Sequence, residues 1–463
     1  MALTVNNVGT LSLLNILNRT SKAQSNVLGQ MATGYKINRG ADDPAGLLAV
    51  TSIDSELTSV NAGIASNQRT DAILGVADGA LGQIASAISD IQRLANESAN
   101  EAGLTADEIA ANQAQIDDAL AAIDRIVSST QFNGKKLLDG SLGINTNVGT
   151  AGAITDVKVF SRTPGSSDVA LTVQRVSAAS AAVVTSVMTT SASADSSFSV
   201  QGKLGTAVIT ALSTENVSSV AYKINQAKAQ TGVSAVVSGT HLNLYSTDTG
   251  SDAFVRTKLI EGNTVQDKSD SGIDAVVTVN GQATAVDGDH VNYSGGGISV
   301  AFDLGSLTST VTLTVKGSGD GRSGATFQLG TNANTRATLG IDGVYTAALG
   351  NATEGYLRSL GSGGANSLIN DPSQAATIAR VAANQVATLQ GRIGGFQKFQ
   401  VNTALNSLND TKEGLETAKG VINDLDYAVA SAELNRQNIL LQSAMSLLGL
   451  ANQQSSQVLS LLR

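Results

Sequence analysis

The sequence predicts a multidomain α+β protein in which long antiparallel, coiled-coil-like helices from both termini flank a β-rich central insertion. Three observations lead to this fold class. The chain has 463 residues, more than a single hydrophobic core usually accommodates. Apolar residues recur at alternating three- and four-residue steps near both ends. Between these regions, short alternating runs are bounded by Gly, Ser, Asn or Asp, which is typical of strands and turns.

The N-terminal region, residues 1 to about 138, has the pattern of long helices. Its first apolar stripe is Val50, Ile53, Leu57, Val60 and Ile64, and its second is Leu74, Leu81, Ile84, Ile88, Ile91 and Leu94. Asp42, Asp43 and Pro44 precede the first stripe. Because the first N–H groups of a helix lack partners, we expect these aspartates to cap a helix whose first position is the proline.

The C-terminal region begins at Asp371 and Pro372, which repeat this capping pattern, and has a helical pattern to its end. A chain terminus usually frays, yet apolar residues continue to the last residues here and also mark one face of the first helix. We therefore predict an assembly core, buried by the pairing of the two termini and by neighbouring copies. Its residues are Leu11, Leu14, Leu17, Leu28, Ile439, Leu440, Leu447, Leu450, Val458 and Leu461.

The central region, roughly 140–350, has the alternation expected of strands, for example in 156–160, 169–173 and 310–315. The pair Asn280-Gly281 favours a tight hairpin turn. One helix, around 217–229, interrupts the strands. The middle of the chain is therefore predicted to be an α+β insertion between two helical arms.

Composition excludes several classes of partner and site. The formal net charge is −9 without a dense basic run, which disfavours nucleic acid and anionic membranes. There is no Cys for a disulfide or a thiolate metal site. No apolar run reaches the roughly 18 residues of a membrane span, so none is expected. The N-terminal residues also lack the features of a signal peptide, and composition alone favours a cytoplasmic protein.

Residues that could carry chemistry are few. The two histidines, His241 and His290, belong to no HExxH motif, and we expect both to be structural or solvated. Residues 319–324 match GxGxxG, but a strand-like segment follows where a dinucleotide site needs a helix, so a loop is expected. No set of nucleophile, base and orienting group is present. The sequence therefore predicts a non-enzyme without cofactor or metal.

Three segments resemble the signature blocks of the bacterial flagellin family. They are GYKINRGADDPAGLLAV (34–50), IDRIVSSTQFNGKKLLDG (123–140) and NRQNILLQSAMSLLGLANQQSSQVLSLLR (435–463). Residues 198–260 resemble the flagellin insertion repeat. The resemblance implies filament-core helices at 1–44 and 411–463, and a helical rod domain with a β-hairpin at 45–175 and 358–410. A β-rich variable outer domain would occupy 176–357.

The resemblance implies a structural subunit that polymerises into the flagellar filament for swimming motility. It implies export by the flagellar type III apparatus without a cleaved signal peptide, which replaces the cytoplasmic expectation with an extracellular one. The implied partners are the chain itself, alone or with other flagellins, an export chaperone, and the cap and hook-associated proteins. Two alternatives stay open: a hook–filament junction protein of the same family, and a filament subunit whose outer domain is also an adhesin.

The narrow apolar seams of the termini lead to a mechanism. Ordering a residue costs roughly 1–2 kcal/mol, so termini with little to bury should be disordered in the monomer and fold on docking. A head-to-tail contact that does not close into a ring then produces a helical filament.

The resemblance also implies a receptor-facing surface on the rod. In enteric flagellins the flagellin-sensing Toll-like receptor contacts an Arg, a Leu one turn further on, and a Glu on the adjacent helix. Alignment places Asp90, Leu94 and Gln115 at these positions. Because Asp90 reverses one charge and Gln115 removes another, weak receptor binding is expected.

Overall fold

The computed structural model describes residues 8–99, 103–165, 167–188, 195–263, 265–317, 324–332 and 334–461. The chain divides into two compact units. Unit 1 consists of Met1–Ala65 and Leu405–Arg463, and unit 2 of Ser66–Ala404. Helices at both ends of the sequence flank a β-rich middle, which confirms the predicted α+β fold class.

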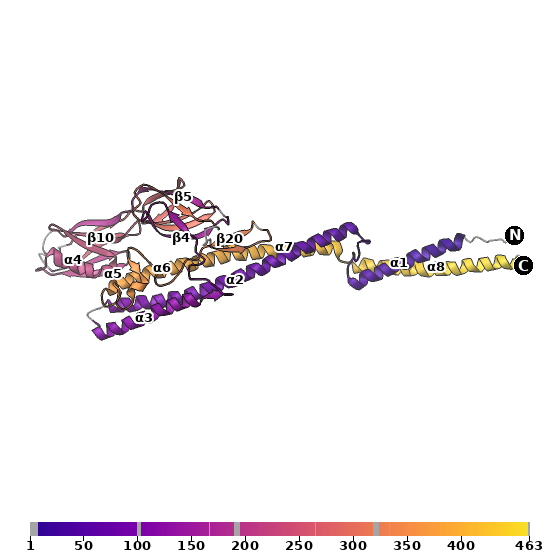
Figure 1. The fold of residues 1–463 in the computed structure, drawn as a ribbon, viewed down its shortest axis with the longest axis horizontal. Helices are drawn as coiled ribbons and strands as arrows, with labels where there is room; N and C mark the ends of the chain where they lie inside the picture. Colours follow the sequence, from indigo (N-terminus) through magenta and orange to yellow (C-terminus); the bar gives the residue numbers. More distant parts are fainter. Residues whose placement is uncertain are drawn as a thin grey trace. The chain divides into compact units, whose positions relative to one another are not determined.

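Unit 1 is helical. It contains α1 (Val8–Thr33), the first part of α2 (Pro44–Ser98), most of α7 (Asn402–Asn423) and α8 (Tyr427–Leu461). Helices α1 and α8 lie side by side and run antiparallel (Figure 1). The side-chain amide of Gln24 donates to Asn438 Oδ1 at 2.7 Å. About three turns nearer the start of α8, the Tyr427 hydroxyl donates to the Met31 carbonyl at 3.1 Å, so polar contacts hold the pair in register.

The first part of α2 and the end of α7 are also joined inside unit 1. The Lys419 ammonium donates a 2.7 Å hydrogen bond to Asp54 Oδ1, and this bond raises the pKa of Lys419 above its usual value. Val50 and Val60 of the first predicted stripe are buried, as is Leu408 of α7. Apolar burial and one ion pair therefore connect two segments far apart in the sequence.

Four helical segments of unit 2 contribute buried apolar residues. They are the rest of α2, α3 (Ala106–Ser129), α6 (Pro372–Phe396) and a π-helical turn, η2 (Gln397–Val401). All six residues of the second predicted stripe of α2 are buried, together with Ile116, Ile123 and Val127 of α3 and with Ile378, Val386 and Ile393 of α6. Helix α3 begins with a capping box in which Thr105 and Glu108 exchange side-chain-to-backbone hydrogen bonds.

Two helices begin at an Asp-Pro pair. Pro44 is the first residue of α2, and Asp43 Oδ1 accepts a 2.9 Å hydrogen bond from the N–H three residues on. Pro372 is the first residue of α6, and Asp371 Oδ1 accepts the equivalent bond at 2.9 Å. In each pair the carboxylate satisfies an orphan N–H and the proline removes another.

Asp42 does not cap α2, contrary to the sequence expectation. Its Oδ2 accepts hydrogen bonds from the backbone N–H groups of Asn38 and Arg39, at 3.1 and 2.9 Å. The physical reason is reach: Asp42 stands one residue before the capping position, which Asp43 already occupies. Asp42 instead closes the turn that leads into the helix.

The larger β-structure of unit 2 has two sheets over a shared core. Their strand orders are β14-β13-β5-β18-β3 and β15-β16-β17-β4-β20-β19. The strands are β3 (Thr146–Val148), β4 (Ile154–Arg162), β5 (Val169–Ser177), β13 (Val276–Val279), β14 (Gln282–Ala283), β15 (Ala285–Asp287), β16 (His290–Gly295), β17 (Ile298–Leu304), β18 (Thr310–Val315), β19 (Ala325–Gln328) and β20 (Arg336–Leu339). Leu171 and Leu313 pair across β5 and β18, and they share the core with Phe302 of β17.

The pairing of β5 bears on the expected domain boundary at residues 175 and 176. This boundary falls inside β5, whose two partners β13 and β18 lie far beyond it in the sequence. The sheet therefore crosses the expected division. Two small strand pairs form separate two-stranded sheets. Strand β1 (Gln131–Phe132) pairs with β2 (Lys135–Lys136), and β21 (Gly350–Asn351) pairs with β22 (Gly355–Tyr356). The 3-10 helix η1 (Leu357–Leu360) follows β22.

A second β-structure includes the segment that resembles the insertion repeat. Its sheets have the orders β6-β10-β9 and β12-β11-β7-β8. The elements are β6 (Ala181–Met188), β7 (Ser196–Gly202), β8 (Gly205–Ala211), α4 (Val217–Gln226), α5 (Lys228–Thr231), β9 (Val233–Ser238), β10 (His241–Thr249), β11 (Phe254–Glu261) and β12 (Lys268–Ser271). Helices α4 and α5 replace the single helix expected at 217–229.

Helix α4 covers one edge strand of each of these sheets, β9 and β8. The side chain of Asn225 exchanges two hydrogen bonds with the backbone of Ala235 on β9, at 2.8 and 3.0 Å. Lys223 donates to the Thr210 carbonyl on β8 at 2.8 Å. Unpaired edge groups are templates for pairing with another chain, so these side chains protect the module from edge-to-edge association.

Among the described residues, one helix has the length and hydropathy of a membrane span. An 18-residue window of α2 has a mean hydropathy of 1.4. The core helix of a soluble protein passes the same test, and the second half of α2 contributes its apolar stripe to the core of unit 2. The absence of a membrane span therefore stays a prediction.

Candidate assembly surface

Small and polar residues fill the contact between α1 and α8. Thr20 and Val27 of α1 are buried, as are Ala430, Gln437 and Ala444 of α8. Short side chains allow two helices to approach closely, but they bury little apolar area. The two terminal helices therefore pair through a narrow contact that leaves the larger apolar residues exposed.

Most of the predicted assembly core lies outside this contact. Seven of its ten residues are between 42% and 64% exposed: Leu11, Leu14, Leu28, Ile439, Leu440, Leu447 and Leu450. Leu17 is half-buried, and the side chains of Val458 and Leu461 lie outside the described residues. The pairing of the two termini alone therefore leaves these seven residues exposed, and their burial by neighbouring copies stays a prediction. We call these seven residues the leucine surface.

The predicted assembly core omits further exposed apolar residues of unit 1. They include Ile16, Leu48, Val421, Val429 and Met445. Periodicity marks all apolar positions of a helix but does not say which of them contact the partner helix. That choice depends on helix register, which here turns Ala430 inward and Val429 outward.

Most of the leucine surface lies in uncharged stretches of sequence, although Arg19 and Lys22 lie between Leu14 and Leu28 on α1. Residues 437–462 contain no Asp, Glu, Lys or Arg, and neither do residues 8–18. Large exposed apolar patches on a protein mark sites of interaction with other macromolecules. The seven leucine and isoleucine side chains can bury apolar area against a partner but supply no acid, base or metal ligand.

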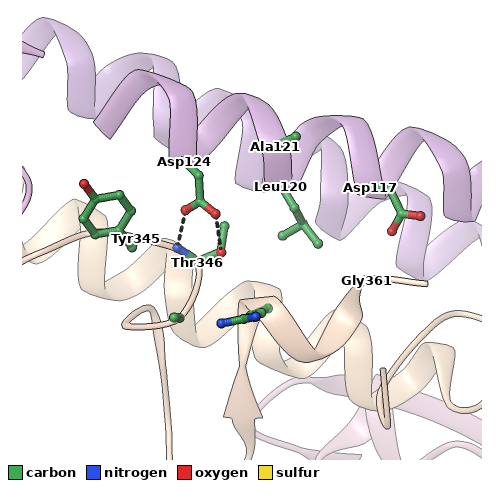
Figure 2. Close-up of a pocket in the computed structure, with 9 residues that line it drawn as sticks. Asp117, Leu120, Ala121, Asp124, Tyr345, Thr346 and Gly361 are labelled. Carbon is green, nitrogen blue, oxygen red and sulfur yellow. Dashed lines mark hydrogen bonds between the residues drawn. The ribbon is translucent and has the colours of Figure 1, made fainter. Parts of the chain in front are cut away.

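Two aspartates of α3, Asp117 and Asp124, line a groove and hold the facing segment by hydrogen bonds. A cavity of about 570 Å³ lies between α3 and the segment that follows the β-structure. Figure 2 shows Asp124 of α3 reaching toward Thr346, whose N–H and hydroxyl both donate to this carboxylate at 2.9 Å. Asp117 accepts hydrogen bonds from the N–H and hydroxyl of Ser362. Burial alone would raise the pKa of Asp117, but hydrogen bonds from Ser362 and Gln113 outweigh it and keep that pKa low.

The other predicted candidates for chemistry are dispersed. His241 begins β10, and His290 begins β16 with its Nδ1 2.6 Å from Asp303 Oδ1. Residues 318–323, which contain most of the GxGxxG match, lie outside the described part of the chain, and strand β19 follows them. Among the described residues, no group of three or more His, Asp or Glu side chains could hold a metal ion.

Family comparisons cover both ends and part of the middle of the chain. Residues 5–142 match the bacterial flagellin N-terminal helical region, and residues 377–462 match the bacterial flagellin C-terminal helical region. Residues 197–248 match the flagellin hook IN motif. A B-type flagellin from Pseudomonas aeruginosa is 28% identical and covers 100% of both chains. The chain belongs to the bacterial flagellin family.

Other relatives are similar over nearly their whole length. A flagellin from Salmonella typhimurium is 27% identical over 99% of each chain, and one from Clostridium tyrobutyricum is 26% identical over 96% of this chain and 97% of the other. The structure of FliC from Burkholderia pseudomallei covers 71% of this chain and 99% of that chain, with 15% identity and a TM-score of 0.25. At such a TM-score the structural similarity adds nothing to the identification.

Membership of the family establishes the general role. The chain is a structural subunit of the bacterial flagellar filament, an extracellular assembly that serves swimming motility. The three family matches coincide with α1 to α3, with α6 to α8 and with the module of β7 to β10. The helical ends and the insertion module thus correspond to separate family segments.

The predicted receptor-facing surface of this flagellin needs a correction. Asp90 and Gln115 are exposed, and Asp90 lies 3.9 Å from Arg93. Leu94 is only 4% exposed and cannot contact a receptor directly. Its spacing from Ile91 places it on the buried stripe of α2, and the residue-by-residue alignment ignored this burial. Weak receptor binding stays a prediction that now rests on Asp90 and Gln115.

Proposed function

We propose that this filament subunit assembles through the leucine surface of α1 and α8, against the same surfaces of neighbouring copies. The observation that carries the proposal is the exposure of seven large apolar residues on a pair of helices whose own contact is made by small residues. A chain that exposes such a patch gains free energy when a copy of itself covers it.

The size of this gain is comparable with the lower part of the cost of association. Covering a half-exposed leucine or isoleucine contributes roughly 1 kcal/mol, because full burial contributes about 1.5–3 kcal/mol. Seven such residues approach the lower part of the association cost of about 4–15 kcal/mol. Because each copy in a helical array contacts several neighbours, repeated weak contacts hold the filament together.

The proposal includes a division of the chain into layers. Residues 1–44 and 411–463 form the filament core, and the helical parts of 45–175 and 358–410 form the rod. Residues 176–357 form the outer domain, to which strands β3 to β5 are added because they pair with β13, β17 and β18. In this division the leucine surface belongs to the filament core, and the β-sheets belong to the outer domain.

Export and further partners belong to the same proposal. The chain leaves the cell unfolded through the flagellar export apparatus, without a cleaved signal peptide. The lack of Cys and the presence of only three Pro support this route, since neither disulfides nor many slow prolyl isomerisations hinder refolding outside. An export chaperone and the cap and hook-associated proteins are its proposed partners.

A charge placed in the leucine surface tests the assembly role. We expect Leu447→Lys and Leu14→Lys to prevent filament growth, because burying an unpaired charge is costly. The matched controls are Ser446→Lys and Asn15→Lys, which place the same charge at neighbouring exposed polar positions. Filament length is measured by electron microscopy, and circular dichroism checks that each variant folds.

The outcomes separate the alternatives. Normal filaments from Leu447→Lys and Leu14→Lys would disprove the assembly role of the surface. Unmodified chain that never forms long filaments would favour the hook–filament junction alternative. A glycan-binding screen on the filaments tests the adhesin alternative, because specific binding would add a role to the outer domain.

A further inference from the structure

Two Asn-Gly pairs occupy turns with nearly the same backbone. The φ angles are 50° and 77° at Asn133 and Gly134, and 51° and 79° at Asn280 and Gly281. Each pair joins two antiparallel strands through a two-residue loop, and positive φ at both residues defines a type I′ turn. All four residues are exposed. Backbone geometry and access to water therefore do not distinguish the two sites.

The asparagine side chains differ in their hydrogen bonds. Asn280 Oδ1 accepts a 2.8 Å hydrogen bond from the N–H of Thr172 on β5, and the Asn280 N–H donates to the Thr172 carbonyl at 2.8 Å. Asn133 makes no side-chain hydrogen bond with any residue that the structure describes. The carboxamide of Asn280 is held against the sheet, whereas that of Asn133 is free to rotate.

The strands beside the turns also differ. Asn133 joins β1 to β2, which form a sheet of their own with only two pairs of residues. Asn280 follows β13, which also pairs with β5 inside the five-stranded sheet. An isolated two-stranded hairpin is only marginally stable in water. Local opening of the turn at Asn133 therefore costs less free energy than opening at Asn280.

We propose that Asn133 is a site of spontaneous covalent modification and that Asn280 is protected from the same reaction. The backbone nitrogen of Gly134 attacks Cγ of Asn133 and loses its proton to water or hydroxide. The carboxamide nitrogen gains a proton and leaves as ammonia, which closes a five-membered succinimide. Water then adds to either imide carbonyl, and the ring opens to an aspartyl or an isoaspartyl residue at position 133.

The glycine in each pair permits this attack. A side chain after the asparagine would obstruct the approach of its nitrogen, and glycine has none. No other atoms crowd Gly134 or Gly281, because a Cβ added at either would meet nothing within 4 Å. Both sites are thus open to the attacking geometry, and the reactivity difference comes from how firmly the carboxamide and the turn are held.

The product changes the hairpin chemically. A new carboxylate appears beside the exposed side chains of Lys135 and Lys136. The isoaspartyl form also adds a methylene to the main chain inside a two-residue loop. Loop length sets hairpin register, so this form is incompatible with the pairing of Phe132 with Lys135.

Peptide mapping by mass spectrometry tests the proposal on the full-length monomer. Folded chain is incubated in mildly alkaline buffer, and deamidation is followed at both sites over time. We expect Asn133 to react about tenfold faster than Asn280, equivalent to ~1.4 kcal/mol in the barrier. In denaturant the two rates should converge, because the hydrogen bond to Thr172 and both hairpins are lost.

Two results would overturn the proposal. Equal rates in the folded chain would show that the hydrogen bond and the sheet do not protect Asn280. An undiminished rate difference in denaturant would show that local sequence, and not the fold, sets the reactivity. Asn133→Gln should remove the reaction at position 133 while leaving the rate at Asn280 unchanged. None of these measurements depends on filament formation.

Discussion

The side-chain amide of Gln397 donates a hydrogen bond to Asp71 at 2.6 Å, which links the π-helical turn η2 to α2. A second link, from Gln390 to Asp78 at 3.4 Å, lies about two turns away. Glycines without close neighbours fall between or beside these links: Gly75, Gly79, Gly391, Gly394 and Gly395. Glycine in a helix interior is destabilising relative to alanine. These glycines therefore lower the stability of both helices near the two hydrogen bonds that join them.

Alanine in place of these glycines should stabilise unit 2. Gly79→Ala and Gly394→Ala place a methyl group in open space, and each should raise the free energy of unfolding by roughly 0.5–1 kcal/mol. Thermal unfolding of the monomer measures the change. As a control, Gly340→Ala should destabilise, because its Cβ would overlap the Val159 carbonyl oxygen. Destabilisation by both helix substitutions would show that these glycines have a packing role.

Deletion of residues 440–463 should abolish polymerisation while unit 2 stays folded. The deletion removes three of the seven residues of the leucine surface, whereas both β-cores consist entirely of residues between 144 and 315. Sedimentation and electron microscopy measure polymerisation, and the β-signal in circular dichroism reports the sheets. Long filaments from the truncated chain would contradict the role of the C-terminal helix.

Backbone amides of α1 and α8 should exchange quickly in the monomer and slowly in the filament. The contact between these helices buries few large apolar residues, so local opening costs little free energy until a neighbour covers the leucine surface. Hydrogen exchange followed by mass spectrometry measures the change. Amides around Ile116 and Ile123 of α3 provide the control, since these buried residues should be protected in both states. High protection of α1 and α8 in the monomer would refute coupled folding and assembly.

Asp342 should reduce stability at neutral pH. Burial raises the pKa of this carboxyl group to about 6, while Lys158 lowers it and Asp156 raises it. The unfolded carboxyl group has a pKa of about 3.9, so the unfolded state releases its proton first as pH rises. The stability contributed by the protonated form is present below about pH 4 and is lost as pH rises through about 6.

Replacement of this group isolates its effect. Asp342→Asn should raise the free energy of unfolding at neutral pH by roughly 1–3 kcal/mol, because two pKa units correspond to about 2.7 kcal/mol and partial exposure reduces the effect. Near pH 4 and below, the difference should shrink toward zero, since both forms are then neutral. Chemical denaturation across this pH range measures it. A gain that does not depend on pH would assign the effect to packing.

Several local features could be predicted because neighbouring residues decide them. The stripe with Leu81 and Ile88 became a buried helix face, since a 3.6-residue period places such residues on one side. The Asn280-Gly281 pair forms the expected hairpin turn, because few other residues accept positive φ at both positions. Both features depend on steric and hydrogen-bonding preferences that act within a few residues.

Contacts between distant segments could not be read from such patterns. Strand β5 pairs with β18, more than a hundred residues away, and alternation alone does not choose a partner or a register. Leu94 looked available to a receptor, but packing of the rod helices buries it. The sequence also did not show which aspartate caps α2: Asp43 does so, and Asp42, one residue earlier, accepts a hydrogen bond from Asn38 instead.

The sequence by itself determined that both ends are apolar, nearly uncharged helices around a β-rich middle, because periodicity and composition are local properties. Only the tertiary structure decided that Ala444 faces α1 while Leu447 faces outward. The reason is geometric: side-chain size sets how closely two helices approach, and their register then selects which residues are covered. The surface left for neighbouring copies follows from that selection.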